Sequence, residues 1–159
     1  MKPLSKLFSS PLPVIRLSVV WFVLVISLIG FIDATYLTVE HYKNVVPPCS
    51  ITEGCEDVLT STYAVVGGIP VALAGAVYYF LILASAFAYL ESKNSRFLKF
   101  AFGLTVLGFL ASLWFVYLQF FVINSLCAYC LVSALTSILL FIAAIYVFSR
   151  KSPADTLPA

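Results

Sequence analysis

Four long apolar runs constrain the fold of this chain more than any other feature of its sequence. They cover about residues 17–39, 69–90, 97–123 and 126–148. An α-helix rises about 1.5 Å per residue, so roughly 20 apolar residues cross the hydrocarbon core of a bilayer. Backbone polar groups in lipid must pair within their own segment. The runs therefore predict an all-α integral membrane four-helix bundle, a single membrane domain over residues 1–159.

The composition of the chain is also typical of a protein embedded in a lipid bilayer. Hydrophobic residues make up 62% of the sequence and charged residues only 10%, whereas charged residues are about a quarter of a typical soluble domain. The first run is too long for the core of a signal peptide, so we expect it to be retained. The net charge is only +2 and Lys and Arg form no block, so we expect no nucleic-acid partner.

The distribution of basic residues predicts which side of the membrane each loop faces. The loop of about residues 40–68 carries only Lys43. The other eight of the nine basic residues lie at the opposite ends of the four runs: Lys2, Lys6, Arg16, Lys93, Arg96, Lys99, Arg150 and Lys151. By the positive-inside rule, tails 1–16 and 149–159 are expected on the cytoplasmic side of the cytoplasmic membrane. Loop 40–68 is then expected on the extracytoplasmic face.

A Cys-x-x-Cys motif opens the fourth run. Cys127 and Cys130 follow a tight turn in which Asn124 or Ser125 is expected to cap the helix. A helix N-terminus carries a partial positive charge, which favours the thiolate form of a nearby cysteine. The thiolate is the attacking species in disulfide exchange. The motif therefore predicts a redox pair, with a static disulfide or inert buried thiols as the alternative.

A second cysteine pair, Cys49 and Cys55, lies in the loop between the first two runs. Pro47 and Pro48 make the chain enter this pair extended, and Gly54 permits a bend. All four cysteines are then expected on one oxidising face, where the pairs can work in relay. Soluble protein thiols would reduce the loop pair, and the loop pair would reduce the helix pair. A disulfide that only staples the loop is the alternative.

The helix pair needs an electron acceptor, and other classes of cysteine site must be weighed against this relay. The sequence has no motif for a heme, flavin or nucleotide, so a lipid-soluble quinone is the simplest acceptor. Four cysteines could instead hold Zn²⁺ or Cu⁺. Thiolates on an oxidising face tend to be lost to disulfides, so we expect no metal. A structural subunit with inert disulfides is a third class.

The order of these motifs resembles a known family. The segment CEDVLTSTYAVVGGIP in the loop and CAYC at the start of the last run are similar to the prokaryotic branch of the vitamin K epoxide reductase family. The resemblance covers about residues 16–148. It implies a four-helix, quinone-dependent thiol oxidoreductase that uses ubiquinone or menaquinone. It also implies a thioredoxin-like, DsbA-like partner protein that is reoxidised to support disulfide-bond formation.

The resemblance also implies a role for each cysteine and for one serine. Cys130 would lie next to the quinone, and Cys127 would exchange with the loop through a transient disulfide to Cys55. Cys49 would be the outer cysteine that bonds to the partner protein. Ser61 would donate a hydrogen bond to the thiolate of Cys130 or to a quinone oxygen. Without the resemblance, Ser61 is equally well an ordinary cap or turn residue.

Two departures from the family pattern affect these expectations. Animal members carry an Asn before the second helix and a Tyr four residues after the last cysteine, whereas this chain lacks that Asn and has Ala134. Reduction of a quinone epoxide or vitamin K epoxide is therefore only the alternative activity. Many bacterial members also carry a fused thioredoxin-like domain. Because this sequence ends at Ala159, we expect its partner to be a separate protein.

Polar and aromatic residues near the predicted outer face complete the candidate site. Asp33 interrupts the first run, and an intramembrane carboxylate is a candidate for quinone binding and proton supply. A carboxylate that bonds a neighbouring helix, or one reached by water, is the alternative. His41 could relay protons, although a solvated interfacial histidine is the simpler interpretation. Trp114, Tyr117 and Phe121 fit an interfacial aromatic belt better than a quinone-stacking role.

Overall fold

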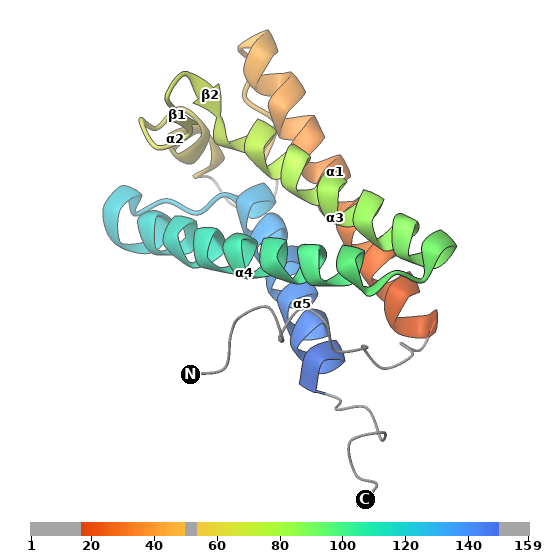
Figure 1. Cartoon of the computed structure of the whole chain (residues 1–159). Helices are drawn as coiled ribbons and strands as arrows, with labels where there is room; N and C mark the ends of the chain where they lie inside the picture. The colour runs from red at the N-terminus through yellow and green to blue at the C-terminus, as the bar shows by residue number, and fades with distance from the viewer. Residues whose placement is uncertain (1–16, 50–53, 150–159) are drawn as a thin grey trace, which may run out of the picture.

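Four long helices make up most of the protein, as Figure 1 shows for the computed structural model, which describes residues 17–49 and 54–149. They are α1 (Leu17–Lys43), α3 (Val71–Ser92), α4 (Ser95–Tyr117) and α5 (Ala128–Ser149). All four are long and apolar enough to cross a membrane, α4 together with the π-helix η2 (Leu118–Ile123). The predicted all-α, four-helix membrane fold is therefore confirmed. The predicted tails lie outside the described residues, apart from Ser149.

Local signals in the sequence explain where α3 and α4 begin and end. Pro70 precedes α3 with φ −59°, a backbone angle that suits a helix start, and its missing N–H costs nothing there. Lys93 ends α3 in the left-handed conformation, and Asn94 caps α4 by accepting a hydrogen bond from the N–H of Arg96. This two-residue turn makes α3 and α4 antiparallel neighbours.

The core of the bundle forms where α1 packs along α3. Tyr79 and Ile82 of α3 are fully buried there. A Cβ atom at Gly30 of α1 would collide with the ring of Tyr79, so glycine is needed for this close approach. Helix α5 packs against α1 and α4 and supplies Leu140 to the same core. Small residues thus allow tight helix packing, as is usual in membrane bundles.

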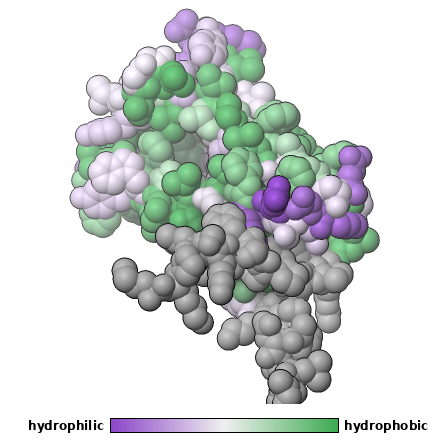
Figure 2. Space-filling view, viewed as in Figure 1, coloured by the Kyte–Doolittle hydropathy of each residue, from purple (hydrophilic) through white to green (hydrophobic). Residues whose placement is uncertain are grey.

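The outer surface of the bundle is apolar. Figure 2 shows hydrophobic residues over most of the visible face, between hydrophilic groups at the end of α1 and at the turn between α3 and α4. Leu107 and Ile32 have exposed fractions of 64% and 60%. Soluble monomers rarely expose such continuous apolar surface. The surface and the four helices together describe a multi-pass membrane protein.

The loop between α1 and α3 folds into a small cap on one end of the bundle. It contains the short helix α2 (Cys55–Leu59) and an antiparallel hairpin of β1 (Val65–Val66) and β2 (Ile69–Pro70). Gly67 and Gly68 turn the hairpin with positive φ angles, which glycine adopts without strain. Figure 1 places this cap near the end of α1 and the start of α5. The loop pair of cysteines is thereby brought to the helix pair.

The structure departs from the predicted runs around the turn between the third and fourth helices. Regular α-helix ends at Tyr117, and the wider turns of η2 follow up to Ile123. Asn124 then reverses the chain in the left-handed conformation, with φ 56°. Helix α5 begins only at Ala128, so Cys127 directly precedes the helix instead of lying in its first turn. Hydropathy does not distinguish these helix types, because both segments are predominantly apolar.

Candidate functional site

The two cysteine pairs of the chain are in different oxidation states. Cys49 and Cys55 form a disulfide, with their Cα atoms 6.1 Å apart. Of the five residues between them, residues 50–53 lie outside the described residues. Cys127 and Cys130 are free thiols. The structure therefore combines an oxidised loop pair with a reduced helix pair.

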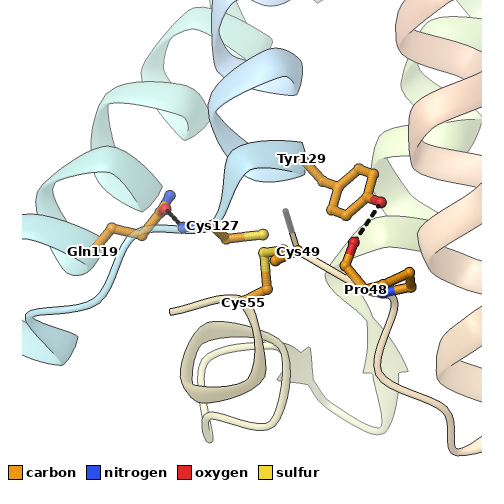
Figure 3. Close-up of a disulfide and its surroundings, with 6 residues drawn as sticks. All are labelled: Pro48, Cys49, Cys55, Gln119, Cys127 and Tyr129. Carbon is orange, nitrogen blue, oxygen red and sulfur yellow. Dashed lines mark hydrogen bonds between the residues drawn. A yellow bond between two sulfur atoms is a disulfide. The ribbon is translucent and has the colours of Figure 1, made fainter. Parts of the chain in front are cut away.

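The two pairs meet in one cluster. The side chain of Cys127 points toward the loop disulfide in Figure 3. Cys55, Val58 and Cys127 form a buried core against which Cys49 and Cys130 pack. Cys55 is 1% exposed and Cys127 is fully buried, so water has little access to the sulfurs between the pairs. This arrangement suits exchange between the two pairs better than independent reaction of each with solvent.

Two hydrogen bonds hold the loop over the start of α5. The hydroxyl of Tyr129 donates to the carbonyl oxygen of Pro48 at 3.2 Å, directly before Cys49 (Figure 3). The hydroxyl of Ser125 donates to a carboxylate oxygen of Asp57 in α2 at 2.7 Å. Ser125 was, with Asn124, one of the two residues expected to cap α5, but its hydroxyl bonds to the loop instead. Both bonds join segments that are far apart in sequence, so composition and spacing did not indicate them.

Cys127 lies where a thiolate is stabilised. Its carbonyl oxygen accepts the N–H of Leu131, so Cys127 occupies the position directly before the first turn of α5. A hydrogen bond from the thiol of Cys130 lowers the pKa of Cys127 from 9.0 to about 7, although burial acts in the opposite direction. The predicted effect of the helix start agrees with this direction. A substantial fraction of Cys127 is therefore thiolate at neutral pH.

A cavity of about 720 Å³ opens beside Cys130. Its wall is mostly aliphatic and comes from α1, α3, α4, α5 and the loop cap. Among the predicted site residues, Cys130, Ser61 and Asp33 line it, whereas Cys49, Cys55 and Cys127 do not. Ligand pockets for small apolar molecules have volumes of about 300–1,000 Å³. The cavity can hold an apolar ring molecule next to Cys130.

The polar groups of the cavity differ in their hydrogen bonding. Ser61 donates its hydroxyl hydrogen to the carbonyl oxygen of Val58 at 2.7 Å, so it faces a ligand as an acceptor unless the side chain turns. One carboxylate oxygen of Asp33 is buried and has no hydrogen-bond partner among residues 17–49 and 54–149. His41 also lines the cavity, and its side chain is exposed. Asp33 is thus the acidic group best placed to interact with a ligand there.

Sequence reasoning missed three polar residues of this region. Gln119 accepts the N–H of Cys127, Tyr129 holds the loop, and Tyr79, which lines the cavity, bonds to hydroxyl groups of α5. Gln119 is the single glutamine of the chain and lies within an apolar run, a signal that could have drawn attention to it. Tyr129 carries no such signal, because tyrosine is common at membrane interfaces.

No metal centre is formed by the part of the chain that the structure describes. Residues 17–49 and 54–149 contain no group of three or more His, Cys, Asp or Glu side chains that could hold an ion. The metal-binding alternative also requires free thiolates, whereas the loop pair is bonded as a disulfide. The described residues instead place a disulfide, a dithiol and an apolar cavity next to one another, which is a chemistry suited to thiol–disulfide exchange.

Comparison with known proteins agrees with this class. The sequence model of the vitamin K epoxide reductase family matches residues 21–145, so the chain belongs to this family, as its motifs predicted. A curated relative is the thiol-disulfide oxidoreductase LTO1 of Arabidopsis thaliana, which is 37% identical over 120 residues. The match covers 69% of this chain and 31% of LTO1, so the chain spans less than a third of that relative.

Proposed function

We propose that this chain is a thiol:quinone oxidoreductase. It takes electrons from the thiols of a separate thioredoxin-like, DsbA-like protein and passes them through two cysteine pairs to ubiquinone or menaquinone. This activity would support disulfide-bond formation on the extracytoplasmic face of the cytoplasmic membrane, with both termini in the cytoplasm. The observation that carries the proposal is the position of Cys127. It points toward the loop disulfide and hydrogen-bonds Cys130, which lines the apolar cavity.

The first half of the reaction transfers two electrons from the partner to the loop pair. A partner thiolate attacks the sulfur of Cys49, and Cys55 leaves as a thiolate. The second partner thiolate attacks the mixed disulfide, so the partner becomes oxidised and Cys49 is released. Cys49 suits the outer role because it is half-buried, whereas Cys55 is 1% exposed.

The loop dithiol then reduces the helix pair. Cys55 attacks Cys127 in a Cys127–Cys130 disulfide, and Cys130 leaves as a thiolate. Cys49 attacks Cys55, which restores the loop disulfide and releases Cys127. The products are an oxidised loop and a reduced helix pair, the same combination of oxidation states that the structure has.

The final step reoxidises the helix pair beside the cavity. A quinone held in the cavity would supply the oxidant, because it can take up two electrons and two protons. Cys130, which lines the cavity, would face it. The thiolate of Cys127 bonds to the sulfur of Cys130 to form the Cys127–Cys130 disulfide, and the two electrons leave through Cys130. One proton comes from the thiol of Cys130 and the other from the carboxyl group of Asp33, which lines the same cavity. Asp33 regains its proton from the aqueous side before the next turnover.

An anaerobic assay tests both the function and the role of Asp33. Purified protein, a reduced thioredoxin-like substrate, and ubiquinone or menaquinone in turn should yield hydroquinone at the rate at which substrate thiols disappear. Asp33→Asn should slow hydroquinone formation by about a hundredfold, since a positioned general acid contributes about 10²–10⁴. Exchange between the two cysteine pairs should keep its wild-type rate. Glu40→Gln makes the same change of charge on α1, at a side chain paired with Lys43, and serves as the control.

Two results of that assay would count against the proposal. Absence of hydroquinone with either quinone would remove the proposed function itself. A wild-type rate in Asp33→Asn would remove only the proton-donating role of this carboxyl group.

A further inference from the structure

Gln119 is an amide side chain buried in the apolar part of the bundle. It is 2% exposed and belongs to the π-helix η2, at the end of the third membrane-spanning segment. Burial of a polar side chain is unfavourable unless its hydrogen bonds are made. Single turns of π-helix inside longer helices are frequent at functional sites, since the extra residue redirects a side chain. The contacts of Gln119 therefore indicate what this turn accomplishes.

Both ends of the Gln119 amide are hydrogen-bonded. Its oxygen accepts the backbone N–H of Cys127 at 2.9 Å, as Figure 3 shows, and its nitrogen donates to the carbonyl oxygen of Phe115 at 3.4 Å. The N–H of Cys127 can only donate, so the amide oxygen must face it. The orientation of the amide is thus determined, and the side chain joins α4 to the residue that precedes α5.

Among residues 17–49 and 54–149, the amide oxygen of Gln119 is the hydrogen-bond acceptor that the N–H of Cys127 meets. Cys127 precedes α5, and the N–H groups at a helix start are not used by the helix itself. Cys127 is fully buried, so water does not replace a missing acceptor. Without an acceptor, this backbone segment would shift to satisfy the N–H group. A shift here would move the sulfur of Cys127 away from the loop disulfide toward which it points.

We propose that Gln119 is a positioning residue whose amide oxygen holds Cys127 in line for exchange with Cys55. The inference rests on the proposed function, because it names the residue that supports one step of that relay. Gln119 lines the cavity, but its amide oxygen is bonded to the N–H of Cys127 and its nitrogen to the carbonyl oxygen of Phe115. It therefore acts through the backbone of Cys127, whereas Cys127 and Cys130 are joined by a short stretch of the same chain segment. Loss of the acceptor should therefore affect exchange between the pairs more than reduction of the quinone.

The experiment isolates exchange between the pairs in a Cys49→Ala background. There the thiolate of Cys55 attacks Cys127 of an oxidised helix pair, Cys130 leaves as a free thiol, and the Cys55–Cys127 bond cannot be resolved by Cys49. Quenched samples give the rate from the appearance of the Cys130 thiol. Gln119→Met keeps the length of the side chain but loses the acceptor, and should slow this step about tenfold. Gln119→Glu keeps an acceptor oxygen and should remain within about twofold of the parent rate.

A second readout separates positioning from general damage to the fold. With Cys49 present and the helix pair already reduced, Gln119→Met should form the first hydroquinone within about twofold of the wild-type rate. Thr105→Val, which removes a 3% exposed hydroxyl bonded within α4, should change neither rate and controls for loss of a buried polar group.

The outcomes distinguish this inference from the proposed function. An unchanged exchange rate in Gln119→Met, or equal losses in the Met and Glu variants, would overturn the positioning role. Equal losses in exchange and in quinone reduction would also overturn it. A wild-type protein that forms no hydroquinone would instead refute the proposed function.

Discussion

Replacing Cys127 with Ala is expected to lower partner-dependent hydroquinone formation by at least about a thousandfold, the scale of loss when an essential reacting group is removed. Cys127 packs between the loop disulfide and Cys130, which lines the cavity. Without Cys127, the partner can still reduce the loop disulfide. The thiol of Cys55, however, has lost the sulfur that it attacks in the helix pair. The loop pair should therefore accumulate as a dithiol, because the second partner thiolate still resolves the mixed disulfide on Cys49 but no later step reoxidises the loop.

The measurement combines hydroquinone absorbance with non-reducing gels of the protein and its partner. Leu135→Ala removes a side chain of α5 that is 56% exposed to lipid and should leave both readouts at wild-type levels. Quinone reduction at the wild-type rate in Cys127→Ala would show that electrons reach Cys130 without Cys127. In that case the order of the relay would be wrong.

Gly54→Val is expected to prevent exchange between the loop disulfide and the helix pair, while quinone reduction by the helix pair is retained. A Cβ atom at Gly54 would lie 2.7 Å from the backbone nitrogen of Leu126 and 2.8 Å from the Cβ atom of Ser125. Backbone at such distances cannot yield as a flexible side-chain end does, so the valine must push the loop away from α5. Because exchange needs sulfurs in contact, we expect partner-dependent turnover to fall about a hundredfold.

Separate measurement of exchange between the pairs and of quinone reduction shows whether the loss of turnover arises at the contact between loop and helix. Gly54→Val protein with a chemically reduced helix pair should form its first hydroquinone at the wild-type rate. Gly103→Val is the matched control, because a Cβ atom at Gly103 meets no heavy atom within 4 Å. Normal partner-dependent turnover in Gly54→Val would mean that close contact between loop and helix is not required.

The sequence predicted the helices and the grouping of the cysteines for a clear physical reason. Lipid requires long apolar segments that satisfy their own backbone hydrogen bonds, so hydropathy alone locates four helices. With four antiparallel spans, a loop after the first and a motif at the start of the fourth must lie at the same end. The family motifs added a role for each cysteine, and these roles remain predictions.

Features that depend on exact backbone placement could not be predicted in this way. The π-helix of η2 is as apolar as an α-helix, and only its geometry brings Gln119 to the N–H of Cys127. The bond from Tyr129 to Pro48 joins residues 81 positions apart, and no local pattern encodes such a pair. Ser61 was named from the resemblance to the family, but its hydrogen bond to the carbonyl oxygen of Val58 in α2 could not be predicted from the motif.

Counting hydroquinone molecules formed by one fully reduced chain tests the central claim most directly. The four thiols of the chain hold electrons for two disulfides, so each pair can supply one hydroquinone. Excess quinone is added anaerobically to protein with all four cysteines reduced and no partner present. We predict two hydroquinones per chain, with both disulfides formed, because the loop pair passes its electrons to the quinone through Cys127. One hydroquinone per chain, with the loop thiols still reduced, would show that the loop pair is not connected to the quinone.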